Sequence, residues 1–418
     1  MTQAAGSAAR AAAERVARQS YGKLVAFLAA RTRDIAGAED ALSEAFAAAL
    51  AQWPGSGIPA SPEGWLLTVA RRRLTDLARH HKARDGAADH LSLMAQEAGS
   101  VGDGSDIPDD RLRLMFACAH PAIDRPVRGA LILQTVLGLD AATIAASALV
   151  PPATMGQRLV RAKAKIRQAG IAFTMPDRVD MPARLDAVLE AVYAAFTQGW
   201  SDPTGMDQRR SGLAEEAIWL GRLVATLLPD EPEALGLLAL MLHLEARRAA
   251  RRDAGGGYVP LDRQDPALWD AAMIRQAEDI LLGASHTGRI GRYQLEAAVQ
   301  SAHAIRRFGH APDWPMLEQL YDALLAITRS PVVGLNRAMV VARTRGPEAG
   351  LADLEPLHGD ARLAGYQPYW AARAELLGRC ARPDEARSAY DRAIALEDDA
   401  GVRAFLRSRR DGLDGGAA

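Results

Sequence analysis

Cysteine and aromatic residues are scarce in this chain of 418 residues, which has two cysteines and only 5% aromatic residues. Cys118 and Cys380 lie far apart and neither belongs to a Cys-x-x-Cys pair, so a disulfide framework is not predicted and a reducing compartment is indicated. Cys118 and His120 have no second pair of ligands, so we predict no metal site. The low aromatic content means that the core must be assembled from many small aliphatic contacts.

Long apolar runs and the familiar catalytic motifs are also missing. No stretch reaches the about 18 apolar residues that a membrane helix needs, so no membrane-spanning segment is predicted. The stretch MTQAAGSAARAAAERVARQS lacks the continuous apolar core of a signal peptide, and we therefore expect a cytoplasmic protein. The metalloprotease, phosphate-loop and nucleophile-elbow motifs do not occur. These absences predict a protein that is not an enzyme and needs no cofactor.

Strands are not predicted either, because runs of Val, Ile and Thr in strict alternation are absent. The chain is instead rich in Ala, Leu and Arg, which are strong helix formers. We predict an all-α fold with a helical bundle, a flexible linker, a helix-turn-helix and a C-terminal α-helical, repeat-like extension.

Helical periodicity and loop composition divide the chain into segments. Apolar spacing predicts two helices between Arg10 and Leu50 and a third over Trp65–Lys82, with a loop rich in proline and glycine at Pro54–Gly64. Acidic residues and four glycines make Asp85–Asp110 a predicted flexible linker. The expected domains are 10–84 (bundle), 85–110 (linker), 111–175 (helix-turn-helix) and 181–418 (extension).

The stretch Thr143–Arg167, TIAASALVPPATMGQRLVRAKAKIR, carries five basic residues and no acidic one, although the net charge of the chain is only −1. A short apolar helix ends at Val-Pro-Pro, and proline is tolerated in the first turn of a second helix. This order is typical of a helix-turn-helix whose second helix lies in the major groove of DNA. A solvated basic helix is the competing interpretation.

Helical spacing predicts which side of that second helix faces the core. The expected inward residues are Met155, Leu159, Ala162 and Ile166. The expected outward residues are Gly156, Gln157, Arg158, Arg161 and Lys165. Thr154, in the first turn, is placed either to cap the helix or to contact a phosphate.

A second basic cluster lies in EGWLLTVARRRLTDLARHHKAR, which includes Arg71, Arg72, Arg73 and Arg79. Two basic helices on either side of a flexible linker predict that the chain contacts one nucleic acid at two places. Tethering strengthens such binding because it makes the second contact intramolecular.

The pattern of the C-terminal half predicts successive helical hairpins. The segment 369–396 matches the two-helix tetratricopeptide pattern through Trp370, Ala374, Leu377, Ala386, Tyr390 and Ala393. Stacked helix pairs of this kind predict an extended repeat-like domain with a concave face.

Taken in order, these segments resemble the extracytoplasmic-function sigma factors of the sigma-70 family, which direct RNA polymerase to promoters. AEDALSEAFAAALAQW and WLLTVARRRLTDLAR are similar to sigma region 2, and LDAATIAASALVPPATMGQRLVRAKAKIR is similar to region 4 without a gap. RLRLMFACAHPAI and EEAIWLGRLVATLLPDEPEALGLLALML resemble the subgroup with a long C-terminal tetratricopeptide-like extension. The resemblance covers Tyr21–Leu396.

The resemblance implies a protein that binds the clamp and flap regions of the RNA polymerase core and recognises promoter DNA. The implied polymerase contacts are Glu39, Asp40, Ser43 and Glu44. The implied DNA contacts are Arg71, Arg72, Arg73 and Arg79 near the −10 element, and Thr154, Gln157, Arg158, Arg161 and Lys165 at the −35 element. The C-terminal domain is expected to modulate activity and to take a protein or small-molecule ligand; whether it activates or inhibits stays open.

Four positions depart from the family pattern. Arg72 replaces the usual asparagine of region 2, Leu149 replaces the usual turn glycine of region 4, and Gly156-Gln157 replaces the usual Lys-Ser. These changes predict an altered base preference and a different turn geometry.

Two other classes of protein fit parts of the sequence. In one, the chain is a helical-repeat scaffold whose tail binds a partner. In the other, it is a stand-alone helix-turn-helix regulator, which would need a dimer to read two half-sites. Binding to the polymerase core distinguishes the predicted sigma factor from both.

Overall fold

The structure is a computed structural model that describes residues 2–85, 109–147, 150–177, 179–201 and 212–413, with the side chains of 2–5, 18, 77–85, 146–147 and 201 left out. Within these ranges the regular elements are helices, with one isolated bridge between Arg252 and Tyr258, and the prediction of an all-α fold is confirmed. Most of the predicted linker, 85–110, falls on residues 86–108, outside the described part of the chain. Two compact units are present, Met1–Ala195 and Phe196–Ala418.

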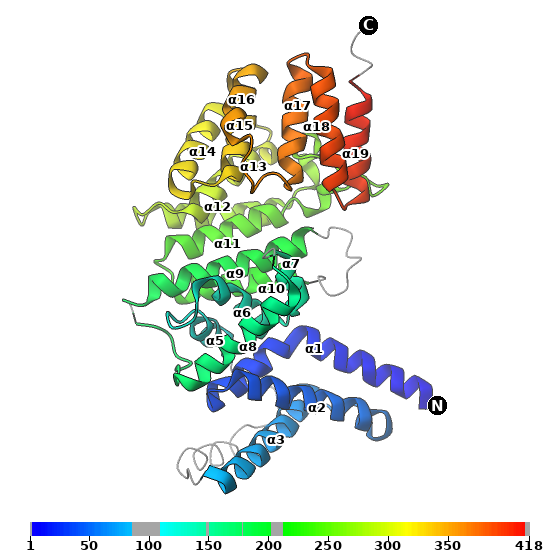
Figure 1. Ribbon diagram of the computed structural model, residues 1–418, viewed down its shortest axis with the longest axis vertical. Helices are drawn as coiled ribbons and strands as arrows, with labels where there is room; N and C mark the ends of the chain where they lie inside the picture. The colour runs from blue at the N-terminus through cyan, green and yellow to red at the C-terminus, as the bar shows by residue number, and fades with distance from the viewer. Residues whose placement is uncertain (1, 86–108, 148–149, 178, 202–211, 414–418) are drawn as a thin grey trace. The chain divides into compact units, whose positions relative to one another are not determined.

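The N-terminal unit is built from two groups of helices. Its elements are α1 (Thr2–Thr32), α2 (Ile35–Ser56), α3 (Pro62–Asp85), α5 (Arg111–Cys118), α6 (Arg125–Leu137), α7 (Ala141–Ser147), α8 (Pro152–Gln168) and the first part of α9 (Met181–Ser201). The packing of α1, α2 and α3 on one another forms the first group, and α5–α8 form the second (Figure 1).

A tight turn joins α1 to α2. Arg33 has a left-handed φ of 54°, and Asp34 caps α2 because its side chain accepts a hydrogen bond of 3.1 Å from the Gly37 N–H. Leu24 and Leu42 are fully buried between these helices. The apolar stripes expected from the sequence therefore form the core of the first group.

The loop predicted at 54–64 is shorter in the structure, where α2 continues to Ser56 and α3 starts at Pro62. Pro54 is tolerated in the last turn because the carbonyl that loses its helical partner belongs to the exposed residue Leu50. Gly57, at φ 84°, ends the helix and donates to the Trp53 carbonyl oxygen. The prediction of a long loop was wrong because composition alone does not locate the last helical turn.

The two groups approach each other closely where α1 meets α6 at Gly22. A Cβ atom at Gly22 would lie 1.8 Å from the carbonyl oxygen of Val136. Only glycine fits there without a backbone shift, so this position fixes how near the two helices lie.

We expect Gly22→Ala to destabilise the chain by about 1–3 kcal/mol, because the added methyl group must push α1 away from α6. Urea unfolding followed by circular dichroism measures the effect. Gly6→Ala is the matched control on the same helix, since no atom lies within 4 Å of the added Cβ. Equal unfolding midpoints for the Gly22→Ala variant and the unchanged chain would contradict the close packing.

The C-terminal unit is an array of short helices. Its α-helices after α9 are α10 (Leu213–Leu227), α11 (Pro232–Glu245), α12 (Ala271–Ser285), α13 (Arg292–Ala304), α14 (Trp314–Thr328), α15 (Pro331–Thr344), α16 (Pro347–Leu354), α17 (Gln367–Arg379), α18 (Pro383–Leu396) and α19 (Ala400–Asp411). The segment between α11 and α12 holds the 3-10 turns η1 (Arg248–Arg251), η2 (Leu261–Arg263) and η3 (Pro266–Leu268); η4 (Ile305–Phe308) follows α13 and η5 (Glu355–Leu357) follows α16.

Consecutive helices from α10 to α19 pack against each other, α11 also packs on α13, and α17, α18 and α19 lie side by side (Figure 1). Between α17 and α18, Ala374, Leu377, Ala386 and Ala393 are almost completely buried. The three alanines among them let the two helices approach closely, as the spacing in the sequence implies. Among the described helices, none combines the length and apolar character that crossing a bilayer needs.

Candidate nucleic-acid interface

The second group of the N-terminal unit contains two consecutive helices, α7 and α8, that pack against each other. Ile144 and Ala145 are buried on α7. The buried side of α8 consists of Met155, Leu159, Ala162 and Ile166, as the helical spacing predicted. This packing turns the remaining arc of α8 away from the core.

The start of α8 differs from one of the sequence expectations. Pro151 occupies the N-cap position, and no side chain caps the helix. Thr154 therefore lies inside the first turn, half-buried, and does not cap it. The phosphate contact of Thr154 stays a prediction.

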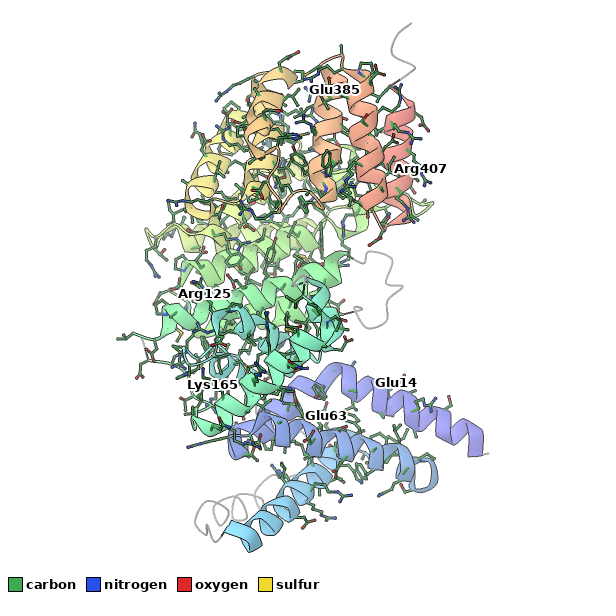
Figure 2. The ribbon with its side chains drawn as sticks, in the orientation of Figure 1. Glu14, Glu63, Arg125, Lys165, Glu385 and Arg407 are labelled. Carbon is green, nitrogen blue, oxygen red and sulfur yellow. The ribbon has the colours of Figure 1, made fainter. Side chains whose placement is uncertain are left out.

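The basic residues of α8 divide into two sets on different sides of the helix. Arg158, Arg161 and Lys165, spaced by three and four residues, are exposed (Figure 2 shows Lys165). Lys163 and Arg167, spaced by four, point to α2 instead, where they meet Glu39 and Asp34. The helix therefore has an outward basic arc, in which Lys165 lies 4.0 Å from Asp124, and a second arc that pairs with Glu39 and with Asp34 at the start of α2, where Lys163 is half-buried and Arg167 is exposed.

The contact between α2 and α8 is a partly buried ion pair. Lys163 Nζ lies 2.5 Å from Glu39 Oε2, and the two side chains are only 11% and 16% exposed. Burial raises the pKa of Glu39, while the ammonium group of Lys163 opposes that rise. Arg167 lies 3.3 Å from Asp34, the cap of α2. The four-residue spacing of Lys163 and Arg167 already places both side chains on one side of α8 in the sequence. The sequence does not show which residues they meet.

The four acidic and polar residues assigned to polymerase binding do not share one environment. Asp40, Ser43 and Glu44 are exposed on α2. Glu39 is half-buried and paired with Lys163. The exposed surface on this side of α2 is thus formed by the other three residues.

The arginines of α3 also differ in their surroundings. Arg72 and Arg73 are exposed, and Arg73 forms an ion pair of 3.1 Å with Glu44. Arg71 is half-buried, with its guanidinium carbon 4.9 Å from the centre of the Phe27 ring. The side chain of Arg79 lies outside the described residues. The described part of α3 therefore offers two exposed cations, one of them paired.

Two tryptophans lie at the ends of the loop between α2 and α3. The rings of Trp53 and Trp65 meet edge to face with their centres 5.5 Å apart, and Trp53 is buried. This contact holds the ends of the loop together, and leaves residues such as Ile58 exposed at its tip.

The Cys-Ala-His triplet lies in the core beside α6. Cys118 is fully buried, with its sulfur 3.6 Å from the Thr135 hydroxyl oxygen, and burial raises the pKa of its thiol to about 12. A thiol held protonated is a poor metal ligand. No cluster of three or more potential metal ligands occurs in the described ranges.

Two family matches accord with this arrangement. Residues 16–84, which contain most of α1 together with α2 and α3, match the family Sigma-70 region 2. Residues 184–285, from α9 to the end of α12, match the Family of unknown function (DUF6596). The first match supports a sigma-70 family sigma factor, a class of non-enzymatic transcription proteins that bind RNA polymerase and recognise promoters.

A full-length relative extends the comparison to nearly the whole chain. Uncharacterized protein R00370 of Rhizobium meliloti (strain 1021) is 41% identical over 401 residues, which covers 94% of this chain and 93% of that protein. The chain belongs to the same family as that protein. No solved structure matches the chain.

Proposed function

We propose that the chain is a sigma factor of the extracytoplasmic-function type with a tetratricopeptide-like C-terminal extension, acting in the cytoplasm without cofactor or metal. In this proposal residues 10–84 act as region 2, residues 85–110 link it to region 4 at 111–175, and residues 181–418 modulate the activity. The partners are the polymerase core and promoter DNA.

The outward basic arc of α8 is the observation that carries the proposal. Three exposed cations on one side of a helix, backed by an apolar side, can neutralise phosphates and reach base edges in the major groove. The match of residues 16–84 to region 2 supports the second of the two proposed DNA contacts. Arg72, Arg73 and Arg79 are assigned to DNA near the −10 element, with Arg71 behind them against Phe27.

The polymerase-binding surface that we propose is the exposed side of α2. Asp40, Ser43 and Glu44 are accessible without any rearrangement. Glu39 can contribute only if its ion pair with Lys163 opens. A charged, exposed surface of this kind suits an interface that forms quickly and in a defined orientation.

Run-off transcription tests the proposed function. Purified polymerase core is combined with the full chain on a pool of genomic fragments, and we expect new transcripts that neither protein makes alone. A stand-alone regulator or a scaffold would not co-purify with core and would yield no new transcript. That result would overturn the assignment.

A chain ending at Met175 tests the modulating role of the extension. We expect the shortened chain to retain core binding and to lose run-off transcription. The reason is that we infer that the extension holds residues 10–84 and 111–175 in an arrangement that permits initiation. Higher activity of the shortened chain would mean that the extension inhibits transcription instead of supporting it. Unchanged rate and promoter choice would remove the modulating role altogether.

A further inference from the structure

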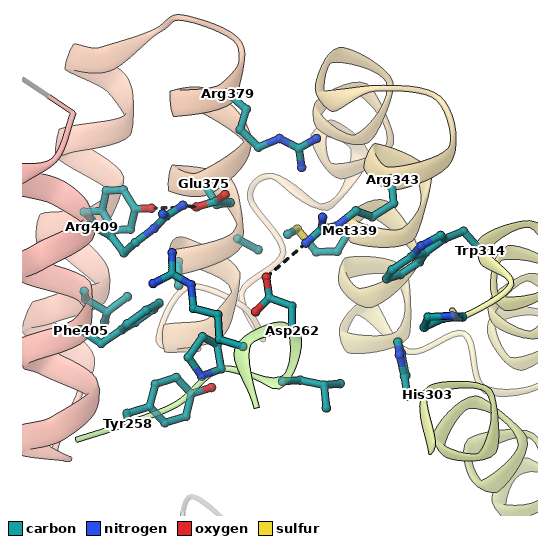
Figure 3. Close-up of a pocket in the computed structure, with 18 of the residues that line it drawn as sticks. Tyr258, Asp262, His303, Trp314, Met339, Arg343, Glu375, Arg379, Phe405 and Arg409 are labelled. Atoms are coloured by element: carbon teal, nitrogen blue, oxygen red, sulfur yellow. Dashed lines mark hydrogen bonds and ion pairs between the residues drawn. The ribbon is translucent and has the colours of Figure 1, made fainter. Parts of the chain in front are cut away.

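The C-terminal unit contains a cavity of about 570 Å³ that the proposed function does not use. Its walls come from the segment 258–263, from α13–α15 and from α17–α19 (Figure 3). A smaller hollow of about 330 Å³ shares Arg263, Glu375, Arg379, Tyr390 and Arg409 with it. Volumes of roughly 300–1,000 Å³ are typical of sites for small organic molecules.

Basic side chains dominate the charged lining of this cavity. Its arginines are Arg263, Arg306, Arg343, Arg379 and Arg409, and its carboxylates are Asp262 and Glu375. His303 adds no positive charge to these arginines, because burial, with Arg247 and Arg306 nearby, lowers its pKa to about 4. The lining therefore has a positive excess that an anion would balance.

Three of these arginines are already engaged by the protein. Arg306 donates a hydrogen bond of 2.7 Å to the carbonyl oxygen of Leu261 and bonds two further backbone oxygens of the same segment. Arg343 lies 3.4 Å from Asp262, and Arg409 pairs with Glu375 (Figure 3). These contacts hold the walls of the cavity in place. They also pair both carboxylates of the lining, Asp262 and Glu375, with arginines.

The other two arginines have no carboxylate partner among the described residues. The Arg379 side chain donates one hydrogen bond of 3.3 Å, to the backbone oxygen of Ala342. The Arg263 side chain makes no hydrogen bond or ion pair with another described residue. Both are exposed, and both line the cavity and the smaller hollow. Their guanidinium groups are the ones free to bind a ligand.

Aromatic rings provide the apolar part of the lining. Tyr258 and Phe405 meet edge to face with ring centres 5.5 Å apart. Trp314 packs edge to face on His303 at 5.9 Å, and Figure 3 shows it on the far side of the cavity from Phe405. A flat or apolar body fits between such walls, while a charged group on it could reach the arginines.

We propose that this cavity binds a small organic anion, whose carboxylate or phosphate group is held by Arg263 and Arg379 and whose apolar body lies among Tyr258, Trp314 and Phe405. Guanidinium groups suit this task because their planar forks match the oxygens of carboxylates and phosphates. The ligand would contact both α13–α15 and α17–α19, so its binding stabilises this unit by mass action.

Calorimetric titration of the full chain with phenyl phosphate, benzoate and benzyl alcohol tests the proposal. We expect saturable binding of at least one anion, and none of the neutral alcohol. The two anions separate a phosphate ligand from a carboxylate ligand. Thermal unfolding in the same solutions should show a higher midpoint only with the anion that binds. No polymerase or DNA is present, so the outcome does not depend on the proposed function.

Replacement of Arg263 and Arg379, the two arginines without a carboxylate partner among the described residues, tests where the anion binds. Arg263→Gln with Arg379→Gln should weaken anion binding by roughly a hundredfold, because each charge-assisted contact contributes about tenfold or more. Arg263→Lys with Arg379→Lys should retain part of the affinity, since the charge stays and the fork is lost. Both pairs are exposed, so the circular dichroism should not change.

Arg407→Gln is the matched control, because Arg407 is an exposed arginine of α19 that lines neither hollow (Figure 2). It should bind the anion like the unchanged chain. The proposal is overturned if neither anion binds saturably at millimolar concentration, if the double glutamine variant binds as well as the unchanged chain, or if Arg407→Gln loses as much affinity.

Discussion

Asp40→Arg combined with Glu44→Arg should abolish capture of the polymerase core, with Kd raised at least about a hundredfold. Like charges placed across an interface cost several kcal/mol. Both residues are exposed, and the Glu44–Arg73 pair is a surface pair worth about 0–1 kcal/mol. The fold should therefore survive, and pull-down of core with circular dichroism on the same samples measures both effects.

Glu14→Arg is the control for this experiment. Glu14 is also an exposed acid of the N-terminal unit, but it lies outside the residues that match region 2 (Figure 2). This variant should bind core normally. If the double variant also binds core with unchanged affinity, the proposed polymerase surface on α2 is wrong.

Arg158→Ala combined with Arg161→Ala should weaken binding to the upstream promoter element by about 2–6 kcal/mol if both side chains contact bases, at about 1–3 kcal/mol for each contact. If they contact phosphates, the slope of log affinity against log salt should fall by about one unit for each arginine. Footprinting by the holoenzyme at several salt concentrations measures both quantities.

Arg10→Ala is the matched control, because Arg10 is an exposed arginine of the same unit on α1. It should leave both the footprint and the salt slope unchanged. A normal upstream footprint for the double variant of α8 would remove the outward arc from the DNA interface.

The sequence predicted the local structure of α8 well because a helix places every residue by a fixed rotation. Spacing alone identified the buried side, from Met155 to Ile166, and the exposed cations beside it. It did not identify Glu39 as the partner of Lys163, since 124 residues separate them and no local rule fixes which helices pack together. The family resemblance implied a polymerase role for Glu39 together with Asp40, Ser43 and Glu44, but in the structure Glu39 is half-buried while the other three are exposed.

The cavity of the C-terminal unit could not be predicted from the sequence either, because its lining also comes from distant segments. Its arginines come from segments spread between residues 263 and 409, and an arginine-rich composition gives many others like them. Only folding distinguishes Arg379, which has a backbone partner, from Arg409, which has a carboxylate. That this unit is helical was predictable, whereas the chemistry of the space between its helices was not.

The ion pair between Glu39 and Lys163 also has a consequence for the order of events during protein synthesis. A ribosome adds about 5–20 residues per second, so the 124 residues between the partners take roughly 6–25 s to make. Throughout that interval Glu39 has no Lys163 to pair with, so any packing among α1, α2 and α3 rests on contacts such as those of Leu24 and Leu42. Packing of the first three helices on the ribosome therefore cannot depend on this ion pair.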